Sequence, residues 1–510
     1  MNDRWRVLGL LRPALVALAQ AAVVVCAEPV PMSRPGAPAS DLFQVEASAP
    51  GGAWVPVPVF PVLVNQRAPA EAAFAALEFE GRIELRIRPR EGRIESAEIR
   101  PLAAGVESRI EGDALRFSLE RPARLSVEIN GERLRNLHLF ASAPPPPPPR
   151  QEDGRRQIVF GPGLHTAANH PAIRAEAHEG GELHWVDVPS DTVVLLHRDA
   201  TVRAGLRLRG AENVHIVGRG VIDCTPWQVP DGRRRAGDGL LAIQAIRLEN
   251  SRHVRIEGPI LLSSPGYLVS AGGAEDLALR DIKGFNHHIW GDGFDFMACR
   301  RVAVEDVFLR TSDDCIAIYA SRWSHRGDSR DFRVERATLW ADKAHPIHLG
   351  THGSQDPARR DTISGLVFRD IDILEHSELY PPYHGAMSVN AGDEVIVRDV
   401  LFESIRVETI DRGELFNVRV IHNPTYNPSP GHRIENVVFR DIDYRGAPPV
   451  TSSIFGYDAG RVVSGVEFHD VRYQGRPATN AADFRLRIGP HVERISVNGI
   501  TQLANSEAYK

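Results

Sequence analysis

Three aspartates lie in two short segments that are close together in the chain. Asp292 belongs to WGDGFDF, residues 290–296, while Asp313 and Asp314 belong to SDDC, residues 312–315. A glycosidic bond is generally cut by one carboxylic acid that protonates the leaving oxygen and another carboxylate that acts as a nucleophile or activates water. Neighbouring carboxylates also raise one another's pKa, which keeps one of them protonated. The three residues therefore predict cleavage of a bond between sugars, provided that the fold brings them together.

A repeated strand pattern surrounds these aspartates. Within each unit, such as VAVEDVFLR from Val302, apolar and polar residues alternate with the period of two that is typical of a β-strand. One such strand cannot bury its apolar side alone, so the units must stack into a continuous column. We expect an all-β fold, a right-handed parallel β-helix of the pectate-lyase type. The units begin at Val214, Val254, Leu277, Val302, Phe332, Leu366, Val400, Val437, Val466 and Ile495.

Stacked coils would place the two acidic segments side by side. Hydrogen-bonded strands lie about 4.8 Å apart, so side chains from adjacent coils form a ladder on a rigid surface. A β-propeller is the alternative, but each of its blades needs several antiparallel strands joined by hairpins. Asn-Gly and Asp-Gly hairpin turns are scarce here. The pattern therefore favours the β-helix.

A run of six prolines, residues 144–149, marks a boundary in the chain. Consecutive prolines favour an extended polyproline form and serve as a stiff spacer. Upstream of them, short alternating segments separated by Gly, Pro and Glu-Gly turns predict a small antiparallel β-sandwich. The predicted domains are residues 1–27 as a signal peptide, 28–143 as the sandwich, 144–153 as a linker and 154–510 as the β-helix.

The amino terminus has the pattern of an export signal. Arg4 and Arg6 precede an apolar stretch, and small residues allow cleavage before Glu28. A lipid anchor on Cys26 is the less favoured alternative. We expect a secreted or periplasmic protein without a membrane span.

Composition excludes some other classes of protein. The formal net charge of −6 does not favour nonspecific nucleic-acid binding. After cleavage only Cys224, Cys299 and Cys315 remain, which argues against a disulfide framework, and their spacing suggests no metal site. Cys299 and Cys315 either pair or, as we favour, pack as small buried hydrophobic residues. Nothing in the sequence specifies an oligomeric state.

The solenoid region, residues 154–500, resembles the polygalacturonases of glycoside hydrolase family twenty-eight and their relatives, the dextranases and isopullulanases of family forty-nine. The family element NTDGFD is similar to WGDGFD, so the resemblance places Asp292 on a catalytic aspartate and Asp295 on a second acidic position near the substrate. The family element GDD is similar to SDD. This places Asp313 on the general acid and Asp314 on a residue that activates water.

A third family element, GHG followed by Ile-Gly-Ser, is similar to AHPIHLGTHG and places His345 on the family histidine. Both flanking glycines are changed here, to Ala344 and Pro346. His348 and His352 lie on the same segment and are alternatives. A histidine at this position could also simply bond a neighbouring carboxylate, and the two roles can coincide.

The fourth family element, an Arg-x-Lys pair that the resemblance assigns to gripping a substrate carboxylate, is not matched. The corresponding strand reads HGAMSVN, residues 384–390, with Met387 and Val389 in the two places. Arg419, on a later coil, could supply a cation or be an ordinary surface arginine. The only lysines of the chain are Lys283, Lys343 and Lys510.

Without that clamp we expect a neutral glycan, or an acidic pectin-related chain recognised in another way. A sandwich ahead of the solenoid is similar to the dextranase group, which favours neutral substrates, although fold alone does not determine specificity. Aromatic residues expected near the cleft could stack on sugar rings or simply pack. They are Trp290, Trp323, Tyr380, Tyr383 and Tyr426.

The predicted reaction is hydrolysis with inversion and without any metal or organic cofactor. Asp313 protonates the glycosidic oxygen, while Asp292 and Asp314 orient and deprotonate water. Inversion predicts about 6.5 to 9.5 Å between acid and base, against about 5 to 5.5 Å for retention.

Two other functions remain open. A polysaccharide lyase would need a basic residue beside a uronate and would release products that absorb ultraviolet light. A noncatalytic glycan-binding solenoid would bind sugar without cleaving it.

Overall fold

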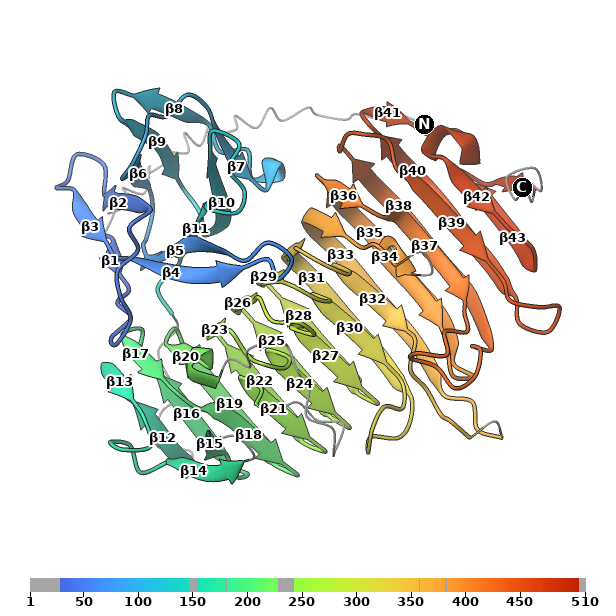
Figure 1. Ribbon diagram of the computed structural model, residues 1–510, viewed down its shortest axis with the longest axis horizontal. Coiled ribbons are helices and arrows are strands. Elements are labelled where there is room, and N and C mark those ends of the chain that lie inside the picture. The colour runs from blue at the N-terminus through green and yellow to red at the C-terminus, as the bar shows by residue number, and fades with distance from the viewer. Residues whose placement is uncertain are drawn as a thin grey trace, which may run out of the picture.

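A computed structural model describes residues 28–145, 154–178, 181–227, 243–356, 358–380 and 383–503. The fold is all-β: a small β-sandwich is followed by a right-handed parallel β-helix, and Figure 1 shows its strands stacked in parallel rows. Both parts of the predicted fold are confirmed. Helix in the described part of the chain is confined to short 3₁₀ turns, among them Leu102–Ala104, Thr225–Trp227 and Ala481–Phe484.

One parallel sheet of the solenoid carries the strands next to the predicted site. Its first two strands form an antiparallel pair, and the later ones come from successive coils and pair in parallel. In order they are β14 (Ile173–His178), β15 (Gly181–Asp187), β18 (Gly205–Arg209), β21 (Ile246–Glu249), β24 (Val269–Gly272), β27 (Phe294–Met297), β30 (Ile316–Tyr319), β32 (Ile347–Gly350), β34 (Gly385–Ala391), β37 (Glu414–Val420), β39 (Thr451–Phe455) and β42 (Leu486–Ile488).

The remaining solenoid strands form a second set that contains the sequence repeat. They are β12 (Arg156–Phe160), β13 (Gly163–His165), β16 (Thr192–Leu196), β17 (Ala200–Val202), β19 (Glu212–Gly218), β20 (Val221–Asp223), β22 (Arg252–Glu257), β23 (Ile260–Leu262), β25 (Glu275–Arg280), β26 (Lys283–Asn286), β28 (Arg300–Glu305), β29 (Phe308–Thr311), β31 (Ser329–Ala341), β33 (Thr362–Ser377), β35 (Ile396–Val407), β36 (Ile410–Arg412), β38 (Arg433–Tyr444), β40 (Val463–Tyr473), β41 (Arg476–Pro477), β43 (Val492–Val497) and β44 (Ile500–Gln502).

The register of these strands matches the repeat read from the sequence. From Val214 to Ile495, each residue that begins a unit is the direct partner of the residue that begins the next one. All of them are buried, so they form the continuous apolar column that the alternation predicted. Farther along the same strands, the rings of Phe368, Phe402, Phe439 and Phe468 stack with centroids 4.9 to 5.1 Å apart. Buried aromatic stacking of this kind holds successive coils at one spacing.

The amino-terminal sandwich consists of two sheets around its own apolar core. One sheet contains β1 (Val30–Pro31), β4 (Val59–Val64), β5 (Ala70–Glu78), β7 (Ala97–Arg100), β10 (Ala123–Ile129) and β11 (Leu137–Ser142). The other contains β2 (Phe43–Ser48), β3 (Val55–Val57), β6 (Ile83–Pro89), β8 (Ser108–Glu111) and β9 (Ala114–Leu119).

Strand β5 is apolar on both of its faces because it joins the sandwich to the solenoid. Ala73, Ala75 and Leu77 face the core of the sandwich, whereas Ala72 and Phe74 belong to a second cluster shared with the solenoid. That cluster includes the solenoid residues Val221, Ile260, Leu262, Phe285, Phe308, Trp340 and Leu374. The sandwich is thus packed onto the β-helix along an apolar face.

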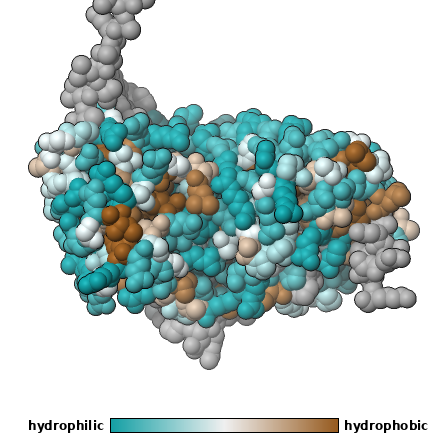
Figure 2. Space-filling view, turned by 90° about the horizontal axis from the view of Figure 1, so that it is seen from above, coloured by the Kyte–Doolittle hydropathy of each residue, from teal (hydrophilic) through white to brown (hydrophobic). Residues whose placement is uncertain are grey.

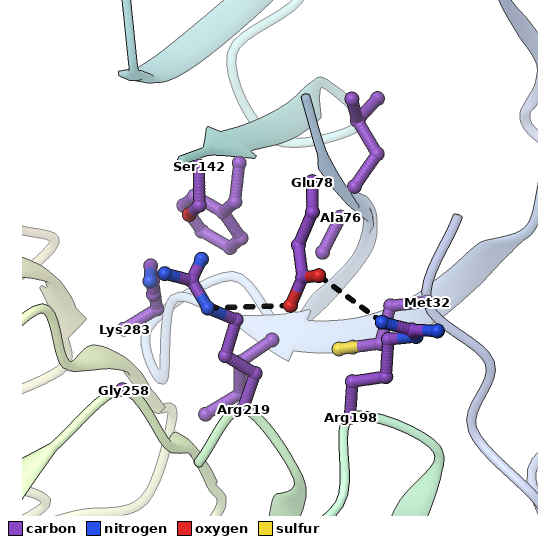
Figure 3. A pocket seen from close by; sticks show the side chains of 11 residues that line it. Met32, Ala76, Glu78, Ser142, Arg198, Arg219, Gly258 and Lys283 are labelled. Carbon is purple, nitrogen blue, oxygen red and sulfur yellow. Dashed lines mark hydrogen bonds and ion pairs between the residues drawn. The ribbon is translucent and has the colours of Figure 1, made fainter. Parts of the chain in front are cut away.

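Ion pairs border this apolar contact. Glu78, at the end of β5, lies between two arginines of the solenoid, 3.1 Å from Arg198 and 3.4 Å from Arg219 (Figure 3). Away from the contact, Figure 2 shows hydrophilic residues over most of one face and hydrophobic residues only in small groups. The apolar residues of the repeat are therefore buried inside the solenoid or between the solenoid and the sandwich.

Three further predictions concern the signal peptide and linker, the cysteines, and a membrane span. The predicted signal peptide and most of the predicted linker lie outside the described residues. Cys224, Cys299 and Cys315 are free and buried, so the predicted packing of Cys299 and Cys315 is confirmed and their pairing is not found. Within the described ranges, no helix has the length and apolar character needed to cross a membrane.

Candidate active site

Asp292, Asp314 and His345 occupy the same position on three successive rungs of the solenoid. Each lies two residues before the start of its strand, which is β27, β30 or β32, and the first residues of these strands are register partners. Backbone hydrogen bonds join the rungs here: Gly293 N–H donates to the Asp314 carbonyl and Cys315 N–H to the His345 carbonyl, each at 2.8 Å. The sheet thus stacks three titratable side chains in one column.

Asp313 completes the acidic cluster from the neighbouring position. Asp292, Asp313 and Asp314 each place a carboxylate oxygen within 4.8 Å of the others. Asp292 and Asp314 are buried and Asp313 is partly exposed. The structure therefore brings the three predicted acids together.

The acids differ in their affinity for protons. Burial and the adjacent Asp314 charge raise the pKa of Asp313 to about 7. Burial, together with Asp295 and the other acids, raises the pKa of Asp292 well above its usual value. Burial acts in the same direction on Asp314, but the nearby His345 and His348 and the hydrogen bonds from His345 outweigh it and lower the pKa of Asp314 to about 2. One pocket thus holds an ionised carboxylate beside carboxyl groups that retain protons.

His345 forms an ion pair with Asp314. Its Nδ1 lies 2.6 Å from Asp314 Oδ1, its backbone N–H donates to the same oxygen at 3.1 Å, and its Nε2 bonds the carbonyl of Tyr383. Burial disfavours the charged ring, yet Asp314 raises the pKa of His345 to about 9. His348 stacks on His345 with centroids 4.5 Å apart, and burial lowers its pKa to about 3. At neutral pH His345 is therefore charged and His348 is neutral.

These groups line an open pocket of about 150 Å³. Its walls are Tyr267, Trp290, Asp292, Asp313, Asp314, Tyr319, Arg322, Lys343, Ala344, His345, His348, Thr351, His352, Glu378, Tyr380, Tyr383 and Tyr426. A larger hollow of about 590 Å³ adjoins it and shares Trp290, Arg322, His352 and Tyr426 with it. The second hollow adds Trp323 and the exposed Arg326. The acids thus face a groove with aromatic walls, and all five aromatic residues proposed from the sequence lie along it.

Two residues predicted to contact substrate lie elsewhere. Asp295 is fully buried and does not line the pocket, and its carboxylate accepts a hydrogen bond from Arg322 at 3.2 Å. Burial outweighs the effect of Arg322 and raises the pKa of Asp295 to about 8. Arg419 donates to Ser453 at 2.7 Å and lies over the ring of Phe455, and it does not line either hollow. The structure therefore does not bring Arg419 to the acids.

Lys343 is a basic pocket residue that sequence reasoning overlooked. Met387 and Val389 are buried in the core, so these two positions do not supply the Arg-x-Lys clamp of the family. Lys343, however, lies on the segment of His345 and lines the pocket, with its Nζ 5.9 Å from the ring centre of Trp290. The sequence analysis named Lys343 but did not place it in the cleft. The sequence signal for a lysine near the acids was the position of Lys343 two residues before His345, in DKAHPIH.

The same side chains could also hold a metal ion. Asp314, His345 and His348 each offer a ligand atom within 4.8 Å of the others, as do the three aspartates. In the structure, however, Asp314 and His345 bond each other directly, and His348 Nε2 lies 2.7 Å from the hydroxyl of Thr351. The ring nitrogens of His345 and His348 thus already have hydrogen-bond partners within the protein.

A parallel β-helix that holds a cluster of carboxyl groups in a groove has the kind of site that glycoside hydrolysis requires. The family model described as "Glycosyl hydrolases family 28" matches residues 196–483, which include the whole acidic cluster. The chain belongs to this family of glycoside hydrolases, as the resemblance in the sequence predicted.

Curated relatives agree with this assignment. The chain is similar to a "Probable endopolygalacturonase D" of Neosartorya fischeri, with 23% identity over 39% of this chain and 37% of the relative. The protein of the same description from Aspergillus flavus is 22% identical over 39% of this chain and 36% of the relative. The match thus spans little more than a third of the length of these relatives.

One solved structure resembles nearly the whole chain. Dex49A from Penicillium minioluteum superposes with a TM-score of 0.59 and covers 92% of this chain and 96% of its own, at 13% identity. This likeness supports the fold of the sandwich and the solenoid together.

The Asp314–His345 pair generates a prediction about protonation. In Asp314→Asn the pKa of His345 should fall from about 9 to below its ordinary value of about 6.5, because the burial that disfavours the charged ring remains while the compensating carboxylate is lost. NMR titration of the histidine rings would measure it, with the resonance assigned by His345→Gln. An unchanged titration near pH 9 would contradict the pair.

Proposed function

We propose that the chain hydrolyses O-glycosidic bonds in a pectin-related polysaccharide or oligosaccharide. The observation that carries the proposal is the cluster of Asp292, Asp313 and Asp314 in one groove, with an acid that retains its proton near neutral pH beside an ionised carboxylate. Glycoside hydrolysis requires such a division of roles. Membership of glycosyl hydrolase family 28 supports hydrolysis rather than elimination or binding alone.

In this mechanism Asp313 is the general acid. It transfers its proton to the glycosidic oxygen as the bond from that oxygen to the anomeric carbon breaks. Asp292 and Asp314 hold a water molecule. Asp314, the ionised carboxylate, accepts a proton from this water while the water oxygen bonds to the anomeric carbon. The raised pKa of Asp292 favours its protonated form, in which it orients the water by a hydrogen bond. His345 keeps Asp314 ionised until it takes this proton, and the Asp314 charge favours the protonated form of Asp313.

The stereochemical outcome proposed is inversion. Its basis is the number of acids: with Asp313 protonated, two carboxyl groups remain to hold one water, whereas a covalent route needs only one nucleophile. The anomer first released therefore decides this part of the proposal.

The proposed substrate carries uronate groups. Lys343 lines the pocket close to Asp313, whose pKa its charge acts to lower, and forms no ion pair within 4.0 Å among the described residues. A cation without a direct ion-pair partner can form a charge-assisted hydrogen bond with the carboxylate of a sugar. Lys343 would thus serve the purpose of the missing Arg-x-Lys clamp from another rung.

Export fits this function. A polymer that is too large to enter a cell must be cut outside it, and residues 1–27 have the pattern of a signal peptide. We propose that the mature enzyme is secreted or periplasmic, with the sandwich over residues 28–143, the proline-rich linker over 144–153 and the catalytic β-helix from residue 154.

Replacing the general acid tests the proposal directly. Asp313→Asn should lower kcat by about 10²- to 10⁴-fold, since it removes the proton donor, while circular dichroism and the melting temperature stay close to wild type. Asp331→Asn, at an exposed position of β31, is the matched control and should keep full activity. Reducing-sugar assays measure the rates on oligogalacturonides and neutral glycans, and proton NMR identifies the first anomer. Wild-type turnover in Asp313→Asn would reject the assignment; release of the retained anomer would reject inversion.

Lys343 should determine the preference for uronate. Lys343→Met should raise KM for an oligogalacturonide by roughly 10- to 100-fold, because a charge-assisted hydrogen bond contributes about 1.5 to 3 kcal/mol. Lys343→Arg should keep most of the affinity. The matched substrate is the same oligosaccharide with its carboxyl groups reduced to alcohols, for which KM should not change. Equal effects on both substrates would show that Lys343 does not bind the carboxylate.

A further inference from the structure

The loop that joins β4 and β5, residues 65–69, reaches from the sandwich to the solenoid beside the pocket. In Figure 1 the end of this hairpin lies next to β29 and β31. The backbone N–H of Asn65 donates to Asp342 Oδ2 at 3.1 Å, and that of Gln66 to Ser312 Oγ at 2.9 Å. The loop therefore contacts the solenoid through directed hydrogen bonds as well as through apolar packing.

A third contact extends the loop to the next rung. Arg67 Nη1 donates to Ser377 Oγ at 3.2 Å. The three acceptors, Ser312, Asp342 and Ser377, are all buried and lie at the ends of β29, β31 and β33. One short loop thus fixes the same edge of three rungs.

Each acceptor is directly followed in the chain by a residue that lines the pocket. Asp313 follows Ser312, Lys343 follows Asp342 and Glu378 follows Ser377. Because neighbouring residues share a peptide plane, a shift of an acceptor's backbone is passed to the pocket residue beside it. The positions of Asp313 and Lys343 therefore depend on where the loop holds Ser312 and Asp342.

A buried ion pair reinforces two of these rungs. Arg310 donates to Asp342 from Nε and Nη2, each at 3.0 Å, and so links β29 to the turn after β31. The sandwich completes this pair: Asn136 Oδ1 accepts from Arg310 Nη1 at 2.9 Å, and the carbonyl of Arg133 accepts from Nη2 at 3.1 Å. A buried charge pair is stable only when its remaining donors are also satisfied. The pair between the rungs thus relies on residues of the sandwich.

We infer that the β4–β5 loop of the sandwich is a positioning element of the active site, which holds the turns that carry Asp313, Lys343 and Glu378. The inference rests on the proposed function, because it assigns a catalytic consequence to the loop. Sub-ångström placement of an acid strongly affects proton transfer to a leaving oxygen. Release of the loop should also admit water to Asp313, and lessening the burial that raises its pKa lowers that pKa.

The test removes one contact at a time. Ser312→Ala deletes the acceptor of Gln66 and should lower kcat by about tenfold or more, in line with the cost of misplacing a reacting group, with KM within about twofold. The alkaline limb of the kcat profile should move to lower pH, a change that a purely structural role would not produce. Ser312→Thr retains the hydroxyl and should restore most of kcat. The control is Ser464→Ala. Ser464 is a buried serine far along the chain, and its hydroxyl accepts a hydrogen bond from Arg494 at 2.9 Å.

A second variant keeps the test valid if Ser312→Ala folds poorly. Arg67→Met changes an exposed side chain and removes the hydrogen bond to Ser377. It should lower kcat less than Ser312→Ala does and move the alkaline limb in the same direction. Arg67→Lys should give a smaller loss of kcat and a smaller pH shift than Arg67→Met. Unchanged kcat and pH profile in well-folded Ser312→Ala and Arg67→Met, with Asp313→Asn inactive, would overturn the inference and leave the proposed function standing. A wild-type protein without hydrolytic activity on any glycan would overturn both.

Discussion

Backbone hydrogen bonds between parallel strands place Asp292, Asp314 and His345 one above another on successive rungs. The spacing of such a ladder is fixed by the sheet, at about 4.8 Å, and not by the side chains themselves. Acidic groups that would repel one another in a flexible loop are thereby held together in a buried column. The apolar residues of the repeat, which pair in register along the solenoid, supply the packing that maintains this arrangement.

The electrostatic properties of the pocket follow from that enforced proximity. A charged His345 stabilises the negative charge of Asp314, and this charge together with burial disfavours ionisation of Asp313. Two adjacent residues of one sequence motif consequently have opposite protonation states near neutral pH. The sandwich contributes from outside the solenoid, since its loop holds the residue that precedes Asp313.

The sequence was informative wherever a local pattern determines the structure. Alternation with a period of two gave the strands, and the shared apolar positions gave their register, because a slip by one residue would have turned every apolar side chain outward. The acids were found through their motifs. Lys343 and Glu378 were overlooked because turn geometry, which has no periodic signal, directs them into the pocket. The contact of Asn65 and Gln66 with the solenoid was not predictable either, since it joins segments that are distant in the chain.

The central claim is that enforced clustering keeps Asp313 protonated near neutral pH, and the pH dependence of kcat/KM tests it most directly. The acid must carry its proton to act, so activity should be present below the pKa of about 7 and be lost as the pH rises through that value. In the residual activity of Asp314→Asn the alkaline limb should shift to lower pH, because the neighbouring negative charge is removed. A profile that remains flat from pH 5 to pH 9, or a limb that Asp314→Asn leaves in place, would contradict the account.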